Sequence, residues 1–220
     1  MLLTLPQAER QKHGRISNLC IRMLQLLGYR FASISEALRG PAEKYVCLCA
    51  EHTTADLLSL PVAGTLFVCI SDLSTNNWDQ VLDFKNGHWE IACSGLTHQN
   101  LTELSYAEQQ SNVLEARSIL KEKLNADPKV FSYPMGAYDA TTVSVVRDAG
   151  FEAAVSTARG VNSSTEQDAY HLRRLTLPVS TIRQLLTLTK YTLLALPESG
   201  TPLLSNAGNS RRRIRSGAIT

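Results

Sequence analysis

The sequence lacks the short motifs that mark the commonest nucleotide and hydrolase sites. Its 220 residues contain no G-x-G-x-x-G, no P-loop and no G-x-S-x-G. It also lacks any run of about 18 apolar residues, so no segment is expected to cross a membrane as a helix. Function must therefore be sought in the order of the elements and in the loops between them.

The sequence also lacks a large excess of either positive or negative charge. The formal net charge of +2 argues against a dedicated nucleic-acid surface. The only dense basic run, RRRIR at 211–215, lies in a tail rich in Ser, Gly and Asn. The composition predicts one domain over residues 1–200 and a basic, disordered tail over 201–220. Contact of this tail with phosphates or acidic lipid is the alternative to a solvated end.

Cysteines are few, odd in number and without a C-x-x-C pair. The five residues fit no zinc ribbon, and Cys47 and Cys49 alternate with apolar neighbours as strand residues do. Free, buried thiols are typical of a reducing compartment. The apolar stretch at the N-terminus is too short for a secretory signal, so the expected location is the cytoplasm.

What the sequence does contain is an alternation of strand and helix patterns. Strands are expected at 45–50, 64–70, 89–93, 129–134, 151–157 and 172–178. Helices are expected at 16–28, 78–84, 105–125, 141–150 and 181–196, and Ser105 with Glu108 forms a capping box at the start of the third. The run GTLFVCI is apolar on both faces, as in a parallel strand covered on both sides. This order predicts an α/β fold with a parallel sheet or barrel.

Polar residues follow three of the expected strands directly. They occur in the segments 51–52 (EH), 94–98 (SGLTH) and 133–136 (YPMG). A β/α barrel keeps its site at such strand ends. One carboxylate and two imidazoles there would suit a divalent metal and a general base. The alternative is that both imidazoles make ordinary loop hydrogen bonds.

The segment from Trp78 to Thr157 resembles the polysaccharide deacetylase family. WEIACSGLTHQNLTELS is similar to the family's second motif, E-I-G-S-H-x-x-x-H-P-x-L, and FSYPMGAYD to its third, an aromatic-proline-Tyr-Gly turn. RDAGFEAAVST resembles the helix and strand that follow, and GTLFV the strand that precedes. The resemblance covers roughly residues 20–190 and implies a distorted or incomplete (β/α) barrel of the deacetylase type.

The resemblance also implies a metal held by one Asp and two His, with an adjacent Asp as base. The first motif, T-F-D-D-G, matches residues 49–53, which places Glu51 at the base position and His52 at the metal Asp position. In the second motif, Ser94 stands at the first His position and His98 at the second. A Ser hydroxyl is a poor zinc ligand. The zinc-like metal expected of the family would therefore have His52, His98 and Ser94 as its ligands.

Two further residues match family positions. Met135 replaces the aromatic residue of the third motif, where its backbone N–H could still hold an oxyanion, and Arg174 stands where some relatives carry an Arg near the base. No later Leu-x-His, the usual general acid, is found.

These departures leave three hypotheses. The first is a hydrolase that removes N- or O-acetyl groups from a saccharide weakly, if at all. The second is a catalytically inactive relative that binds glycan or serves as a partner in an exopolysaccharide or envelope-glycan pathway. The third is an unrelated α/β binding protein.

Overall fold

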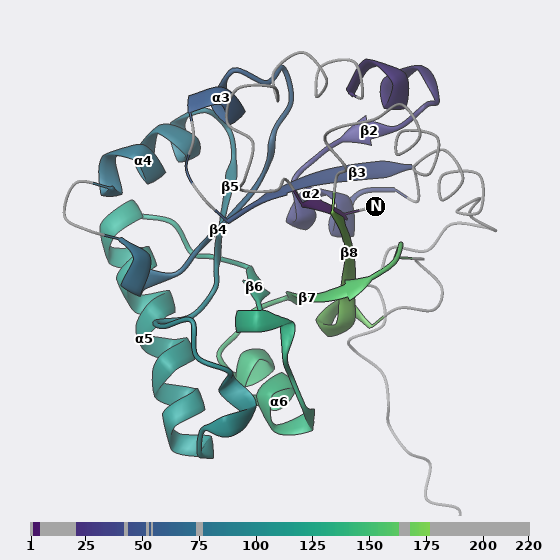
Figure 1. Cartoon of the computed structure of the whole chain (residues 1–220). Coiled ribbons are helices and arrows are strands. Elements are labelled where there is room, and N and C mark those ends of the chain that lie inside the picture. Colours follow the sequence, from purple (N-terminus) through teal and green to yellow (C-terminus); the bar gives the residue numbers. More distant parts are fainter. Residues whose placement is uncertain are drawn as a thin grey trace, which may run out of the picture.

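The computed structural model describes residues 2–4, 21–41, 44–51, 53, 55–73, 77–162 and 168–176 (Figure 1). The strands are β1 (Leu2–Thr4), β2 (Arg30–Phe31), β3 (Tyr45–Ala50), β4 (Gly64–Val68), β5 (Glu90–Cys93), β6 (Val130–Ser132), β7 (Ala153–Arg159) and β8 (Leu172–Thr176). The α-helices are α2 (Ile34–Arg39), α3 (Ala55–Leu58), α4 (Trp78–Asn86), α5 (Tyr106–Leu124) and α6 (Ala140–Asp148). Short 3-10 turns are η1 (Ile70–Asp72), η2 (Leu101–Glu103), η3 (Pro134–Gly136) and η4 (Ala169–His171).

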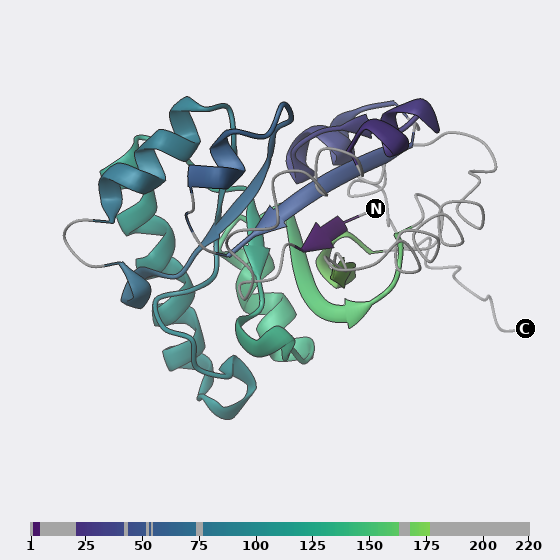
Figure 2. The same ribbon diagram turned by 45° about the horizontal axis from the view of Figure 1, so that its top comes forward.

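Seven of the described strands form a closed ring of parallel pairings. From β3 to β8 each strand pairs with the next, and β1 pairs with both β8 and β3. Figure 2 shows β1 between these two strands. A regular barrel has eight strands, and here the β7–β8 pairing also shifts register between Val155 and Arg159. The expected distorted, incomplete (β/α) barrel is thus confirmed, although the sequence analysis missed β1.

Side-chain alternation gives the ring two apolar faces. An inner cluster takes every second residue of its strands, including Leu2, Cys47, Cys49, Phe67, Ala92, Val130, Ala153, Val155 and Leu172. The intervening residues pack outward against α4, α5 and α6, which lie outside the ring (Figure 1). Strands buried on both faces have continuous apolar sequences, and these strands can therefore be predicted from the sequence.

The N-terminal end of the ring is covered by α2. The Ile34 N–H donates to Thr65 Oγ1 over 3.1 Å at the start of β4. The Ser35 hydroxyl donates to the carboxylate of Glu90 at the start of β5, and the Thr65 hydroxyl donates to the same carboxylate over 2.9 Å. With this end covered, the opposite end, where the strands finish, is the one left for a site.

The long helix α5 is stabilised by a capping box at its start and by an apolar stripe along its inner face. Ser105 Oγ accepts from the Glu108 N–H, and the Glu108 carboxylate accepts from the Ser105 N–H, so the predicted capping box is present. The stripe of Val113, Ala116, Leu120 and Leu124 is buried. This helix therefore has a fixed start and a fixed inner face.

Other expectations have different outcomes. Of the helix expected at 16–28, residues 16–20 lie outside the described residues and residues 21–26 are helical, with Leu26 87% exposed. Cys47, Cys49 and Cys93 are free and buried as predicted, whereas Cys20 lies outside the described residues. The helix expected at 181–196 and the tail at 201–220 also lie outside them. Among the described helices, none has the length and apolarity needed to cross a membrane.

Candidate functional site

The strand alternation places four polar side chains at the C-terminal mouth, which we define as the end of the ring where the strands finish. Two residues beyond the inward Cys49 comes Glu51, beyond Phe67 comes Cys69, beyond Ala92 comes Ser94, and beyond Leu172 comes Arg174. Because β3, β4 and β5 are consecutive neighbours in the ring, Glu51, Cys69 and Ser94 follow one another around the mouth.

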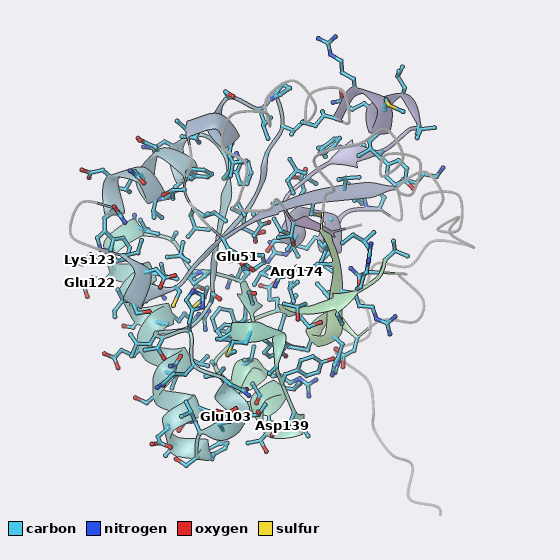
Figure 3. All side chains as sticks on the ribbon, in the orientation of Figure 1. Glu51, Glu103, Glu122, Lys123, Asp139 and Arg174 are labelled. Atoms are coloured by element: carbon cyan, nitrogen blue, oxygen red, sulfur yellow. The ribbon has the colours of Figure 1, made fainter. Side chains whose placement is uncertain are left out.

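Glu51 and Arg174 form an ion pair across the ring. Arg174 Nη1 lies 2.6 Å from Glu51 Oε1, and the two side chains meet near the centre of Figure 3. Arg174 Nε donates to the Ser156 carbonyl over 2.9 Å, and its guanidinium lies 6.0 Å from the Phe67 ring centroid. The Arg174 side chain is only 7% exposed, whereas that of Glu51 is 40% exposed. The guanidinium therefore fixes a carboxylate that still reaches solvent.

Ser94 is buried and its hydroxyl is already engaged. Ser94 Oγ donates to the Ser132 carbonyl over 3.3 Å, and the Ser94 N–H donates to the Val68 carbonyl over 2.8 Å. The side chain is thus used to join the ends of β5 and β6. A neutral hydroxyl in this setting is a weak metal ligand, because it would have to lose a proton of high pKa to bind well.

His98 pairs with a residue that the sequence analysis did not single out. Its Nε2 lies 2.7 Å from Oδ2 of Asp72, which belongs to η1, directly after β4. Both side chains are about half exposed. Cys69 is close to the pair, and one ligand atom from each of the three residues lies within 4.8 Å of the others. Among the described residues this is the one group of three or more His, Cys, Asp or Glu side chains placed to share a metal ion.

Backbone and amide hydrogen bonds hold the two loops of this group together. The Ile70 N–H donates to the Gly95 carbonyl over 3.2 Å, and the Ser71 N–H to the Leu96 carbonyl over 2.9 Å. From α5, Asn112 Oδ1 accepts from the Leu96 N–H, and its Nδ2 donates to Thr97 Oγ1. The loops after β4 and β5 therefore form one braced unit.

Gly95 is required in this unit. It has φ +85°, and a Cβ there would lie 2.7 Å from Asn112 Oδ1. The third motif has a similar need, because a Cβ on Gly136 (φ +74°) would meet the Thr157 side chain at 1.9 Å.

Met135 adopts a left-handed backbone conformation at φ 58°, ψ 4°, which is uncommon for a residue other than Gly, Asn or Asp. Its side chain is exposed. The turn is closed by its neighbours, since the Gly136 and Ala137 N–H groups donate to the Tyr133 and Pro134 carbonyls. Strained turns of this kind cluster at functional sites.

Burial changes the acidity of the thiol at the mouth. It raises the pKa of Cys69 above its ordinary value, and a hydrogen bond with Ser71 partly offsets this. Burial also raises the pKa of Cys93 to about 12, so that thiol stays neutral and unreactive near pH 7.

The structure thus gives different outcomes for the predicted site residues. It brings Glu51 and Arg174 into contact, whereas His52 lies outside the described residues. Cys69 and Asp72 are not predicted from the sequence, because GTLFVCI is typical of a buried strand and Asp72 belongs to no motif. The alternation of Thr65, Phe67 and Cys69 on one face was the signal that could have placed this thiol at the mouth.

Comparison with known proteins bears on this arrangement. Residues 54–154 match the family model described as polysaccharide deacetylase. The fold is similar to that of the deacetylase PplD from Streptococcus pyogenes, with a TM-score of 0.71 and 18% identity over 86% of this chain and 96% of that one. Over the matched segment the chain is similar to the polysaccharide deacetylases.

Further structures agree on the fold of this relative. IcaB from Ammonifex degensii gives a TM-score of 0.68 at 16% identity, covering 86% of this chain and 95% of that one. A de-N-acetylase from Aggregatibacter actinomycetemcomitans gives 0.61 at 14%, covering 82% and 95%. No curated protein sequence matches significantly. The chain accordingly shares the fold of these deacetylases.

Polysaccharide deacetylases act on saccharides and are in general metal-dependent. Of the two second-motif positions, Ser94 donates its hydroxyl to a carbonyl, and only His98 offers a strong ligand atom.

Proposed function

We propose that this chain binds an acetylated saccharide at the C-terminal mouth and hydrolyses its N- or O-acetyl groups slowly compared with ordinary enzymes. The contact between Glu51 and Arg174 is the observation that carries the proposal. It sets a partly exposed carboxylate, fixed in direction by a buried guanidinium, at the place where the resemblance expects a base.

The proposed roles use the chain's own groups. Glu51 takes a proton from the water that attacks the acetyl carbonyl and returns it to the departing amine or hydroxyl group, and Arg174 is a positioning residue that orients Glu51. The Met135 N–H, in the turn that the Gly136 and Ala137 N–H groups close, donates to the oxyanion. The metal ligand set expected from the resemblance, His52, His98 and Ser94, contains only two strong ligands. Catalytic zinc usually has three, so we expect that set alone to retain metal weakly.

The second candidate is a catalytically inactive relative that binds glycan, or acts as a partner in an exopolysaccharide or envelope-glycan pathway. The bond from the Ser94 hydroxyl to the Ser132 carbonyl favours it, because a neutral hydroxyl held in this way is a weak metal ligand at the position where the resemblance expects an imidazole. A relative that binds glycan also requires a saccharide at the mouth, and it differs from the first candidate in that no acetate is released.

The deciding experiment measures acetate released from acetylated chito-oligosaccharides by the purified chain and by Glu51→Gln. The amide keeps an acceptor for Arg174 but cannot take a proton, so acetate release should fall about 100-fold or more. Glu122→Gln, an exposed change on α5, is the matched control and should retain full activity.

If Glu51→Gln releases acetate as fast as the unaltered chain, Glu51 is not the base. If the unaltered chain binds the oligosaccharide in a calorimeter but releases no acetate, the inactive relative is the correct function.

A further inference from the structure

We propose that Cys69, Asp72 and His98 form a binding site for a divalent metal of the zinc type at the C-terminal mouth, with a ligand set different from that expected of the family. The inference deepens the proposed function, on which it rests for its catalytic meaning, by naming the residues that hold the metal. As a binding site it stands on the geometry of these three side chains.

The first support is the position of Cys69. The inner-face alternation of β4 puts its side chain at the mouth, beside the neighbouring strand end that carries Ser94. The Ser94 N–H donates to the Val68 carbonyl, so these two strand ends are in direct contact. A thiol therefore lies next to the position at which the sequence has replaced an imidazole with a hydroxyl.

The second support is distance. One ligand atom each from Cys69, Asp72 and His98 lies within 4.8 Å of the others, and His98 Nε2 is 2.7 Å from Asp72 Oδ2. Metal bonds of about 2.0–2.3 Å in a tetrahedral site put the ligand atoms roughly 3.5 Å apart. The His–Asp separation of 2.7 Å needs to open slightly, and the Cys–His and Cys–Asp separations are at most 4.8 Å. The half-exposed Asp72 and His98 side chains have the freedom to make these adjustments.

The third support is chemistry. Thiolate, carboxylate and imidazole are all zinc ligands, and three protein ligands with an open fourth position are the composition of catalytic zinc sites. A thiolate also favours zinc over magnesium or calcium, which prefer oxygen. Two anionic ligands offset the charge of the metal, which His98 paired with Ser94 could not do. A cysteine thiol must lose its proton to bind zinc, so metal binding by Cys69 would release a proton to solvent.

The fourth support is the rigid framework around the ligands. The loops after β4 and β5 are joined by two backbone hydrogen bonds, Ile70 to Gly95 and Ser71 to Leu96. Asn112, buried on α5, holds the β5 loop at the Leu96 N–H and at Thr97 Oγ1. The segment that carries Asp72 and the segment that carries His98 are thereby held in one register, and Asn112 supports the site without binding the metal.

The test is titration of the metal-free chain with cobalt, which substitutes for zinc and shows a thiolate-to-cobalt charge-transfer band when a cysteine is bound. We expect one cobalt per chain with this band, and its displacement by zinc. Cys69→Ser should abolish the band, and His98→Ala should lower cobalt affinity about 100-fold or more, because even indirect supports of a metal site are worth 10- to 100-fold. Asn112→Ala should lower affinity about 10-fold with the band retained.

His88→Asn is the matched control. It removes an exposed imidazole, at a residue whose positive φ of 66° asparagine tolerates, and it should leave the titration unchanged. Far-ultraviolet circular dichroism of every variant separates loss of binding from loss of fold. Asp72→Asn, which keeps the hydrogen bond to His98, provides a second ligand test that does not depend on Cys69.

Two results would overturn the inference. One is absence of a thiolate band at one equivalent of cobalt, and the other is a folded Cys69→Ser variant with unchanged cobalt affinity. Acetate release distinguishes this failure from failure of the proposed function. A chain that binds cobalt through Cys69 but releases no acetate keeps the site and loses the activity. If the unaltered chain releases acetate but Cys69→Ser binds cobalt with unchanged affinity, the proposed function is kept and the proposed metal site is wrong.

Discussion

Arg174 shows at the scale of one residue how a charge is accommodated at the mouth of the barrel. The guanidinium is nearly buried, which would be costly without partners. It has a carbonyl partner in Ser156 and a carboxylate partner in Glu51. The two bonds leave from different nitrogens of a rigid planar group, a geometry that lysine cannot reproduce.

We therefore expect Arg174→Ala to lower the free energy of unfolding by about 2 kcal/mol, because the buried Ser156 carbonyl loses its donor. Arg174→Lys should restore only part of this. Glu51→Gln should cost less than about 1 kcal/mol, since Glu51 is partly exposed and glutamine still offers an acceptor. Urea denaturation of the three variants gives the order, and equal losses for Ala and Lys would contradict the two-bond geometry.

At the scale of one element, α5 connects stability with the site. Its inner stripe packs on the ring, and Asn112 on the same helix braces the loop that carries His98. A change that shortens or loosens the start of α5 should therefore also disturb the loop that carries His98, because Asn112 holds that loop.

Ser105→Ala removes the side-chain half of the capping box and should lower the free energy of unfolding by about 1 kcal/mol. Ser111→Ala is the matched control, because it makes the same chemical change at an exposed position inside the helix, where alanine is the better helix former. Thermal melting of both variants decides the matter. An unchanged midpoint for Ser105→Ala would mean that the cap contributes nothing.

Elements with strong periodicity were predictable, and the others were not. The runs 64–70 and 89–93 are apolar enough to reveal parallel strands, and Ser105 with Glu108 reveals where a helix starts. The strands β1 and β2 have three and two residues, too few for any periodicity. At the site, Glu51 and Arg174 were predictable through the resemblance. Asp72 was not, because its meeting with His98 depends on which strands become neighbours.

At the scale of the whole molecule, stability should depend on carboxylates that the fold holds ionised. Hydrogen bonds from Thr142 lower the pKa of Asp139, and those from Ser105 lower the pKa of Glu108. A hydrogen bond from Lys129 is the main cause that lowers the pKa of Asp127. Each lowered pKa contributes stability that is fully present above the ordinary value for that group and is lost as pH falls below it.

We expect the denaturant midpoint to fall as pH drops through the ordinary values of 4.5 for Glu and 3.8 for Asp. Asp139→Asn keeps an oxygen that caps α6 but does not titrate there. The stability difference between this variant and the unaltered chain should therefore shrink with falling pH. A difference that stays constant from pH 7 to pH 3 would show that Asp139 is not part of the acid sensitivity.

The ring is closed by β1, whose residues pair with β3 on one side and with β8 on the other. During synthesis these first residues leave the ribosome about 170 positions ahead of their β8 partners. Loop-closure entropy makes such a distant pairing a late event in folding. We infer that the ring stays open along the β1–β8 seam until β8 has been made. A nascent chain stalled before residue 172 would therefore present the edge of β1 to other proteins, including chaperones.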